Sequence, residues 1–267
     1  MLSCAPGGPV AGFAPLPVAV DEALHFLAVP GMRALATPGL AATARAVARG
    51  VAEQAMVCVT GPSGVGKTFA AQATLTAHPP AHCLLLRLRS RPDPCDLRCA
   101  FHEALGLAGP PPTDPGTADE LVLEALGGRS RIVVVDEAHQ LSPACFEYLR
   151  YVYDAVPGGV CMVLVAAQDG GQVLGEVRML ASRCMAWVRI GPLPPDQVPS
   201  AARGLHPVWH RAPDTLLHHA DARFAHGRLR AWAALTHHTR RALRSRPEPV
   251  TGELLERIAC RVGPVPR

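Results

Sequence analysis

The segment GPSGVGKT, residues 61–68, combines residue types and a spacing that suit the binding of a triphosphate. It fits the pattern G-x-x-x-x-G-K-[ST] and lies between a β-branched run and an Ala-rich helical segment. Glycines let the backbone curl so that successive N–H groups face one anion, and the start of the next helix adds its positive end. We therefore expect a phosphate-binding loop made of Gly61, Pro62, Ser63, Gly64, Val65, Gly66, Lys67 and Thr68.

Lys67 is the only lysine among the 26 basic residues of the chain. An arginine bias of this size is typical of a GC-rich genome, so a retained lysine indicates a position that arginine cannot fill. Lys67 is expected to reach the β- and γ-phosphates of the bound triphosphate as a compact point charge. The hydroxyl of Thr68 is expected to bind Mg²⁺.

Two adjacent carboxylates follow a buried apolar run in RIVVVDEAHQLS, residues 131–142. This run places Asp136 and Glu137 at the carboxyl end of a central strand, beside the phosphate loop. We expect Asp136 to hold Mg²⁺ through a water molecule and Glu137 to orient and polarise the attacking water. The alternative is a pair of acids that caps the next helix. His139 is interpreted as a packed or hydrogen-bonded neighbour rather than a catalytic base.

The letters D-E-A-H, residues 136–139, also label a large group of RNA and DNA helicases. A helicase of that group needs two α/β domains, because arginines from the second domain complete the site. The 267 residues contain strands for one sheet only. We therefore interpret D-E-A-H as the acid pair followed by two neighbours.

The elements around these motifs alternate between strands and helices. This alternation predicts an α/β fold, a five-stranded parallel sheet with helices on both faces. The predicted strands are Ala55–Thr60, Cys83–Leu88, Arg131–Asp136, Val160–Ala167 and Met185–Ile190. The predicted helices run from Lys67 to about Ala77, over Asp96–Leu107 and Thr117–Gly128, from Pro143 onward with Ser142 as N-cap, and over residues 172–182.

The strand pattern stops at GPLPPDQVP, residues 191–199. We expect a flexible leader over residues 1–20, a nucleotide-binding α/β domain over 21–190 and a small all-helical domain over 191–267. The last domain carries 12 basic and 6 acidic residues, a net charge of +6, whereas residues 1–190 carry 14 basic and 16 acidic residues, a net charge of −2. Its predicted helices cover 197–204, 213–222, 228–245 and 252–261.

The helical segment RLRAWAALTHHTRRALRSR, residues 228–246, concentrates this positive charge. Its arginines would neutralise phosphates of double-stranded DNA without reading the base sequence. A solvated face in an arginine-biased chain is the alternative. The longest apolar run, residues 160–167, is too short to span a bilayer, so we expect no membrane association and a cytoplasmic location.

Cysteine and histidine do not favour a transition-metal site. Cys95 and Cys99 are four residues apart and have no second pair nearby, and the paired histidines of residues 206–238 have no cluster of cysteines or acids beside them. The nine scattered cysteines fit a reducing compartment.

The segments GPSGVGKT and VVVDEAHQLSPACFEYLRYVYD resemble those of the AAA+ ATPases, specifically the origin-recognition/DEAH-type branch. This branch includes transposition ATPases of the MuB, TniB and TnsC kind and ExeA-like ATPases, and the resemblance covers about residues 20–245. It implies ATP and Mg²⁺ as ligands, ATP hydrolysis, self-assembly, and a helical lid as the last domain.

The resemblance also implies roles for isolated polar residues. Gln168, after the fourth strand, matches the sensor of the γ-phosphate. Arg183, before the fifth strand, matches the arginine finger that reaches the nucleotide of a neighbouring subunit, and we expect it on the same sheet edge as the phosphate loop. Arg230 matches the sensor arginine of the lid, with Arg228 as a competitor.

Three functions are consistent with these features. The first is an AAA+ ATPase that self-assembles with ATP, binds DNA and helps a transposase engage its target. The second is an ExeA-like or signalling ATPase that acts on protein partners without DNA. The third is a module that binds ATP and hardly hydrolyses it, which the presence of Glu137 argues against.

Overall fold

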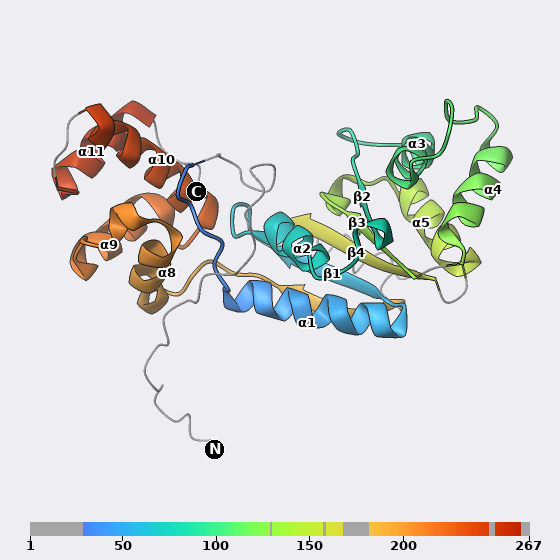
Figure 1. Cartoon of the computed structure of the whole chain (residues 1–267), viewed down its shortest axis with the longest axis horizontal. Coiled ribbons are helices and arrows are strands. Elements are labelled where there is room, and N and C mark those ends of the chain that lie inside the picture. Colours follow the sequence, from blue (N-terminus) through green and yellow to red (C-terminus); the bar gives the residue numbers. More distant parts are fainter. Residues whose placement is uncertain (1–28, 129, 157–158, 168–181, 246–248, 263–267) are drawn as a thin grey trace, which may run out of the picture. The chain divides into compact units, whose positions relative to one another are not determined.

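The computed structural model describes residues 29–128, 130–156, 159–167, 182–245 and 249–262 (Figure 1). These residues form two compact units. One is an α/β unit, residues 38–191, and the other is a helical unit that combines the described residues before Pro38 with those from Pro192 onward. In the described part of the chain, no helix has the length and apolar character needed to cross a membrane.

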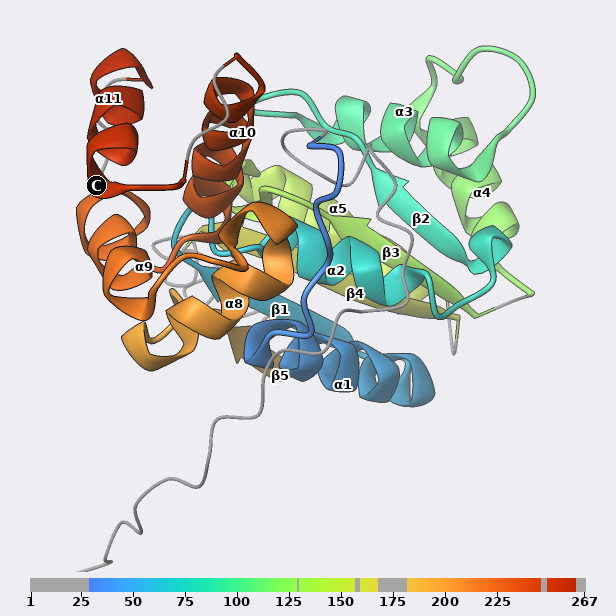
Figure 2. The same ribbon diagram turned by 60° about the vertical axis from the view of Figure 1, so that its left-hand side comes forward.

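The α/β unit is built on a sheet of five parallel strands in the order β2-β3-β4-β1-β5 (Figure 2). Because the strands are parallel, their carboxyl ends lie along one edge of the sheet. The predicted five-stranded parallel sheet is confirmed. The strands are β1 (Met56–Gly61), β2 (Cys83–Leu86), β3 (Arg131–Val135), β4 (Val160–Ala167) and β5 (Cys184–Arg189).

Helices cover both faces of this sheet, and the alternation of strand side chains shows which helix covers which face. Met162 of β4 belongs to a buried cluster that contains Leu149 of α5. On the other face α1 lies so close that a Cβ added to Gly50 would come 3.0 Å from the Cys161 sulfur. The described helices of this unit are α1 (Pro38–Glu53), α2 (Lys67–Leu75), α3 (Pro94–Leu105), α4 (Pro115–Leu126) and α5 (Pro143–Ala155), with short 3₁₀ turns η2 (Pro80–His82) and η3 (Ala138–Gln140).

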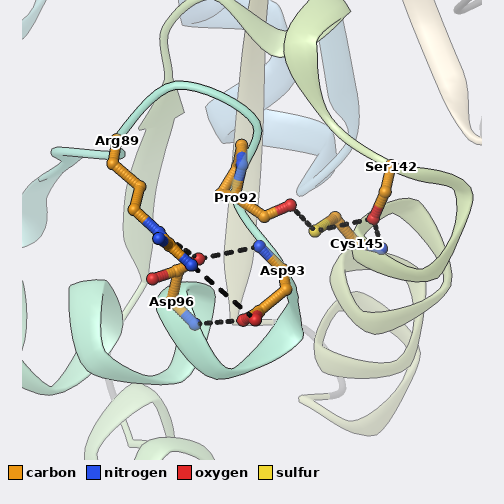
Figure 3. Close-up of polar contacts among 6 residues, drawn as sticks. All are labelled: Arg89, Pro92, Asp93, Asp96, Ser142 and Cys145. Carbon is orange, nitrogen blue, oxygen red and sulfur yellow. Dashed lines mark hydrogen bonds and ion pairs between the residues drawn. The ribbon is translucent and has the colours of Figure 1, made fainter.

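Three of these helices begin with a capping side chain followed by proline. Asp93 caps α3, Asp114 caps α4, and Ser142 caps α5 as predicted. In α3, Asp93 accepts a hydrogen bond from the Asp96 N–H at 2.9 Å, and the Asp96 carboxylate accepts one from the Asp93 N–H at 2.8 Å (Figure 3). Arg89 pairs with Asp96 at 2.7 Å, so the loop after β2 is tied to the start of α3.

The start of α5 is tied to the same loop. The Cys145 thiol donates to the carbonyl of Pro92 at 3.2 Å, and the Cys145 N–H donates to the hydroxyl of the N-cap Ser142 at 3.3 Å (Figure 3). The two connections that leave β2 and β3 are therefore joined by side chains near the carboxyl edge of the sheet.

The helical unit packs around two tryptophans. The rings of Trp209 and Trp232 meet edge to face with centroids 5.4 Å apart, and the Trp209 Nε1–H donates to Thr236 at 2.9 Å. The buried Asp221 carboxylate accepts hydrogen bonds from the Trp232 Nε1–H and the Gly227 N–H, each at 2.8 Å, which fixes the turn before α10. The elements are η4 (Pro195–Gln197), α8 (Val198–Leu205), η5 (Pro207–Trp209), α9 (Asp214–Ala220), the π-helical turn η6 (Asp221–Ala225), α10 (Leu229–Ser245) and α11 (Gly252–Val262).

Residues 29–37 belong to this helical unit, whereas the sequence pattern places them with the α/β domain. The physical reason is packing: Leu35 is buried in the cluster that contains Leu205, and the Arg33 N–H donates to the Leu205 carbonyl at 2.9 Å. The predicted leader, residues 1–20, and all but the last residue of the predicted helix over 172–182 lie outside the described residues.

Candidate nucleotide-binding site

The predicted phosphate loop connects the carboxyl end of β1 to the first turn of α2. Gly64 and Gly66 have φ values of 81° and 99°, which a residue with a Cβ rarely adopts. A Cβ on Gly61 would lie 2.1 Å from the carbonyl oxygen of Ile190, so only glycine fits there. Val65, by contrast, is buried and anchors the loop to the core. The glycine pattern therefore reflects a tightly curled backbone with one apolar anchor.

The amino end of α2 suits an anion. No side chain caps it, and its first turn contains no acidic residue. Amide N–H groups at such an end point outward and carry partial positive charge. The Lys67 ammonium donates to the carbonyl of Pro62 across the loop at 2.8 Å, which holds the side chain over the curl that the glycines make.

Asp136 and Glu137 directly follow β3 at the carboxyl edge of the sheet. Glu137 has a left-handed backbone, φ 53° and ψ 35°, and its N–H donates to the Asp136 carboxylate at 2.9 Å. The Glu137 side chain is 58% exposed, so its carboxylate is accessible from solvent. Both acids stand at the position that the strand pattern predicts.

His139 links the acid pair to the phosphate loop through β4. The Ala167 N–H donates to His139 Nδ1 at 3.2 Å, and His139 Nε2 lies 3.4 Å from the Glu137 carboxylate. Ala167 is the residue of β4 that pairs with Gly61 of β1. A short series of contacts therefore runs from Glu137 to the first residue of the phosphate loop.

These contacts also define the role of the imidazole. Because Nδ1 accepts a hydrogen bond, a neutral His139 carries its proton on Nε2, where it faces the carboxylate of Glu137. His139 thus accepts a hydrogen bond from Ala167 and lies within ion-pair distance of Glu137, so it is a packed and hydrogen-bonded residue beside the acid pair.

The residues at this edge fit ATP and Mg²⁺. The curled loop, the uncapped start of α2 and Lys67 supply N–H donors and positive charge for phosphates. The hydroxyl of Thr68 and the carboxylate of Asp136 are the hard oxygen ligands that Mg²⁺ prefers.

Arg183 lies at the opposite edge of the sheet from the phosphate loop. Its carbonyl accepts a hydrogen bond from the N–H of Met56, the first residue of β1, at 3.3 Å, whereas the loop follows Gly61, the last residue of β1. A rise of about 3.3 Å per residue separates the two ends of β1 by roughly 16 Å. The expectation that Arg183 shares the edge of the phosphate loop is therefore wrong, because a residue that precedes a parallel strand lies at its amino end.

Asp154 at the end of α5 holds the guanidinium of Arg183. The two side chains form a bidentate pair, with Nε and Nη2 each 2.7 Å from a carboxylate oxygen. The hydrogen bond from Arg183 lowers the pKa of Asp154, and the nearby charge of Arg150 contributes. Asp154 was not predicted as a functional residue, although the quoted segment VVVDEAHQLSPACFEYLRYVYD ends in an aromatic residue, Tyr153, followed by this Asp.

The other predicted residues are less defined by the structure. Gln168 lies outside the described residues, directly after Ala167. Arg230 is exposed in the first turn of α10 and Arg228 is half-buried just before it, both in the helical unit. Their roles as sensors stay predictions.

Comparison with known proteins agrees with this geometry. Residues 51–174, from the end of α1 to just beyond β4, match the family described as AAA domain. No curated protein sequence matches the chain significantly.

Solved structures show the same P-loop AAA+ fold. The ORC2 protein of Aeropyrum pernix, in ADPNP and ADP complexes, is 12% identical with a TM-score of 0.68, over 94% of this chain and 72% of that one. The ORC1 protein of Aeropyrum pernix in complex with DNA is 20% identical with a TM-score of 0.68, over 90% and 69%. Thermotoga maritima RuvB is 15% identical with a TM-score of 0.56, over 81% and 66%. At these identities the likeness concerns the fold alone.

Proposed function

We propose that the chain binds ATP with Mg²⁺ and hydrolyses it at the carboxyl edge of the sheet. The observation that carries this proposal is the series of contacts from Glu137 through His139 and Ala167 to Gly61, which brings the acid pair beside a curled glycine loop. The match of residues 51–174 to an AAA domain supports it.

The side chains at this edge have separate tasks. Lys67 and the loop N–H groups bind the phosphates, and Thr68 with Asp136 holds Mg²⁺, which when bound supplies positive charge to the β- and γ-phosphates. Glu137 orients the attacking water and polarises it. The Nε2–H of His139 fixes the Glu137 carboxylate in that position. Catalysis then rests on positioning and charge, as phosphoryl transfer requires.

Substitution of Glu137 by Gln tests hydrolysis separately from binding. Glu137→Gln keeps the shape of the side chain and removes its charge, so ATP affinity is expected to stay near that of the wild type while turnover falls by about 10²- to 10⁴-fold. Both are measured on the full chain, by calorimetry and by phosphate release. If the wild-type chain binds ATP but hydrolyses it no faster than Glu137→Gln does, the chain is a module that binds ATP without turning it over, and the proposal of hydrolysis is wrong.

We further propose that the helical unit binds double-stranded DNA through one face of α10. Arg230, His237, Arg241 and Arg244 recur at helical spacing on the face opposite the buried Trp232. Both Arg241 and Arg244 are exposed, and α10 contains no acidic residue. The ORC1 protein, which has a similar fold, was solved in complex with DNA.

Two double variants with equal charge changes test this face. Arg241→Ala/Arg244→Ala is expected to weaken binding to duplex DNA and to reduce the slope of log affinity against log salt by about 2, because two phosphate contacts are lost. Arg45→Ala/Arg49→Ala removes the same charge from the exposed side of α1 and is the matched control. Equal losses in both variants would refute a specific role for α10, and no binding at low salt would remove DNA from the proposal.

The biological setting that we propose is a transposition-type regulator that assembles with copies of itself and controls DNA binding by nucleotide state. An ATPase acting on protein partners, as ExeA-like or signalling proteins do, is the second candidate. It is favoured by the apolar side chains of Met185 and Trp187, which are 36% and 45% exposed on the edge strand β5. A transposase that co-purifies with the chain only when ATP and DNA are present would favour the first setting.

A further inference from the structure

Two cysteines from adjacent strands meet inside the α/β unit. β1 and the edge strand β5 are neighbours in the sheet (Figure 2). Cys58 lies in the middle of β1, and Cys184 is the first residue of β5. Their Sγ atoms are 2.9 Å apart although the two residues are 126 positions apart in the chain. A disulfide bond is about 2.0 Å long, so the two sulfurs lie within about 1 Å of bonding distance.

The pairing of β1 with β5 is irregular next to the two cysteines. The register between β1 and β5 shifts between Met56 and Val57, the residues that directly precede Cys58. At such an irregularity one strand carries an unpaired residue and the ladder is locally disrupted, and this irregularity lies directly beside Cys184. Cys184 is also the first residue of β5, and β5 is an edge strand that pairs with β1 alone in the five-stranded sheet. The geometry is thus suited to a cross-strand link.

The two thiols differ in their surroundings. Cys58 is fully buried, whereas Cys184 is partly exposed. The hydrogen bond with Cys184, and then burial, raise the pKa of the Cys58 thiol far above its usual range, so Cys58 stays protonated. The same hydrogen bond lowers the pKa of Cys184. Cys184 is therefore the nucleophilic partner that solvent-borne oxidants reach, and Cys58 is the resolving thiol.

We propose that Cys58 and Cys184 are a redox-active dithiol that hydrogen peroxide converts to a reversible disulfide between β1 and β5. The Cys184 thiolate attacks one peroxide oxygen: an S–O bond forms, the O–O bond breaks, and the departing hydroxide takes a proton to become water. The Cys58 sulfur then attacks the sulfenic sulfur of Cys184: the S–S bond forms, the S–O bond breaks, and the hydroxide leaves as water with the Cys58 proton. Two thiols are oxidised and one peroxide is reduced to two waters.

A disulfide between Cys58 and Cys184 would also affect the stability of the α/β unit. Cys58 is three residues before Gly61, where the phosphate loop begins, and Cys184 directly follows Arg183. A covalent bond across β1 and β5 closes a loop of more than a hundred residues and restricts the unfolded chain. The thermal midpoint of the oxidised chain is therefore higher than that of the reduced chain, and dithiothreitol reverses the difference.

Peptide mapping of the full chain tests the proposal without any measurement of ATPase activity. The reduced protein is treated with hydrogen peroxide, its remaining thiols are alkylated in denaturant, and peptides are analysed without reduction. We expect a linked peptide pair containing Cys58 and Cys184, the loss of two alkylatable thiols and a mass lower by two hydrogen atoms. Exposed Cys95 and Cys99 on α3 provide the internal comparison.

The variants fix the order of the steps and the specificity. In Cys184→Ser the Cys58 thiol should remain fully alkylatable at the same peroxide dose, and Cys95→Ser/Cys99→Ser should leave the Cys58–Cys184 link unchanged. The proposal is overturned if Cys95 and Cys99 are oxidised while Cys58 and Cys184 stay thiols, or if Cys184 advances to the sulfinic acid with Cys58 still free.

Discussion

The backbone of Glu137 adopts a conformation that few residues with a side chain accept. Its φ of 53° lies in the left-handed region, where a non-glycine residue costs about 1–3 kcal/mol. Two contacts hold it there: its N–H donates to Asp136, and its carboxylate faces the Nε2 of His139. A strained backbone of this kind persists only where neighbouring groups hold it in place. We therefore expect the imidazole of His139 to help fix the position of the Glu137 carboxylate.

Removal of the His139 side chain should therefore affect turnover more than binding. In His139→Ala the Glu137 carboxylate loses its link to Ala167, and a displacement of about 1 Å lowers kcat by roughly 10- to 100-fold. The dissociation constant for ATP should stay close to that of the wild type, because Lys67 and the loop are unchanged. Phosphate release and calorimetry measure the two effects, with exposed His210→Ala as the control. Equal kcat values for His139→Ala and His210→Ala would contradict the positioning role.

An ion pair at the amino edge of the sheet joins helix α5 to the start of strand β5. Asp154 at the end of α5 accepts two hydrogen bonds from Arg183, the residue before β5. These hydrogen bonds hold the pKa of Asp154 below its value in the unfolded chain, which is about 3.9. A depressed pKa means that the pair stabilises the fold at pH values above the unfolded-state pKa, and that this stability is lost as the pH falls through the folded-state pKa.

Asp154→Asn should reveal this dependence. At pH 7 the variant is expected to be less stable than the wild type by up to about 1 kcal/mol, because the pair is more than one-third exposed on the Asp154 side. The difference should shrink as the pH falls below about 4, because the carboxylate of the unfolded wild-type chain then takes up a proton, and it should vanish once the pH is below the folded-state pKa. Urea denaturation at several pH values measures it. A difference that persists unchanged at pH 3 would indicate that lost shape, and not lost charge, destabilises the variant.

The elements of the α/β unit were largely predictable because apolar runs and turn residues mark them. Buried strands such as Val160–Ala167 match the structure to the residue, whereas α3 and α4 begin two residues before their predicted starts. The reason is local: an Asp side chain before a proline caps each helix, and only Ser142 was interpreted in this way.

Contacts that depend on strand register were not predictable. The hydrogen bond between Ala167 and His139 exists because the end of β4 reaches beyond the end of β3, and nothing in the residue types indicates that register. The approach of Cys58 to Cys184 likewise follows from an irregularity in the pairing of β1 and β5. The edge on which Arg183 lies was predictable, because a residue before a parallel strand lies at the amino edge of the sheet. The expectation that placed Arg183 beside the phosphate loop was nevertheless wrong.

At the level of the whole molecule, the position of Arg183 bears on assembly. It lies at the amino end of β5, roughly 16 Å from the phosphate loop by the rise of β1, which is farther than an arginine side chain extends. Arg183 therefore does not reach the nucleotide of its own chain, and we propose that it contacts the nucleotide bound by a second copy of the chain. In that case the Arg183 guanidinium leaves its ion pair with Asp154 when the copies assemble.

A mixing experiment tests shared sites. Glu137→Gln lacks the residue that orients water, and Arg183→Ala lacks the arginine that a neighbour would receive, so each variant alone should be inactive, the second by about 10³-fold or more. An equimolar mixture should recover part of the wild-type turnover, because some sites then combine an intact Glu137 with an intact Arg183. A mixture that stays as inactive as its components would contradict sharing between subunits.

The most direct test of the account is calorimetric titration of ATP, with Mg²⁺ present, into the wild-type chain and into Lys67→Ala. If the loop after β1 and the acid pair after β3 bind one triphosphate, the wild type binds a single ATP per chain and Lys67→Ala binds it about 10- to 100-fold more weakly, because one charged hydrogen-bond donor is lost. The surface variant Arg45→Ala/Arg49→Ala should bind as the wild type does. No heat of binding in the wild type, or equal affinity in Lys67→Ala, would contradict the central claim.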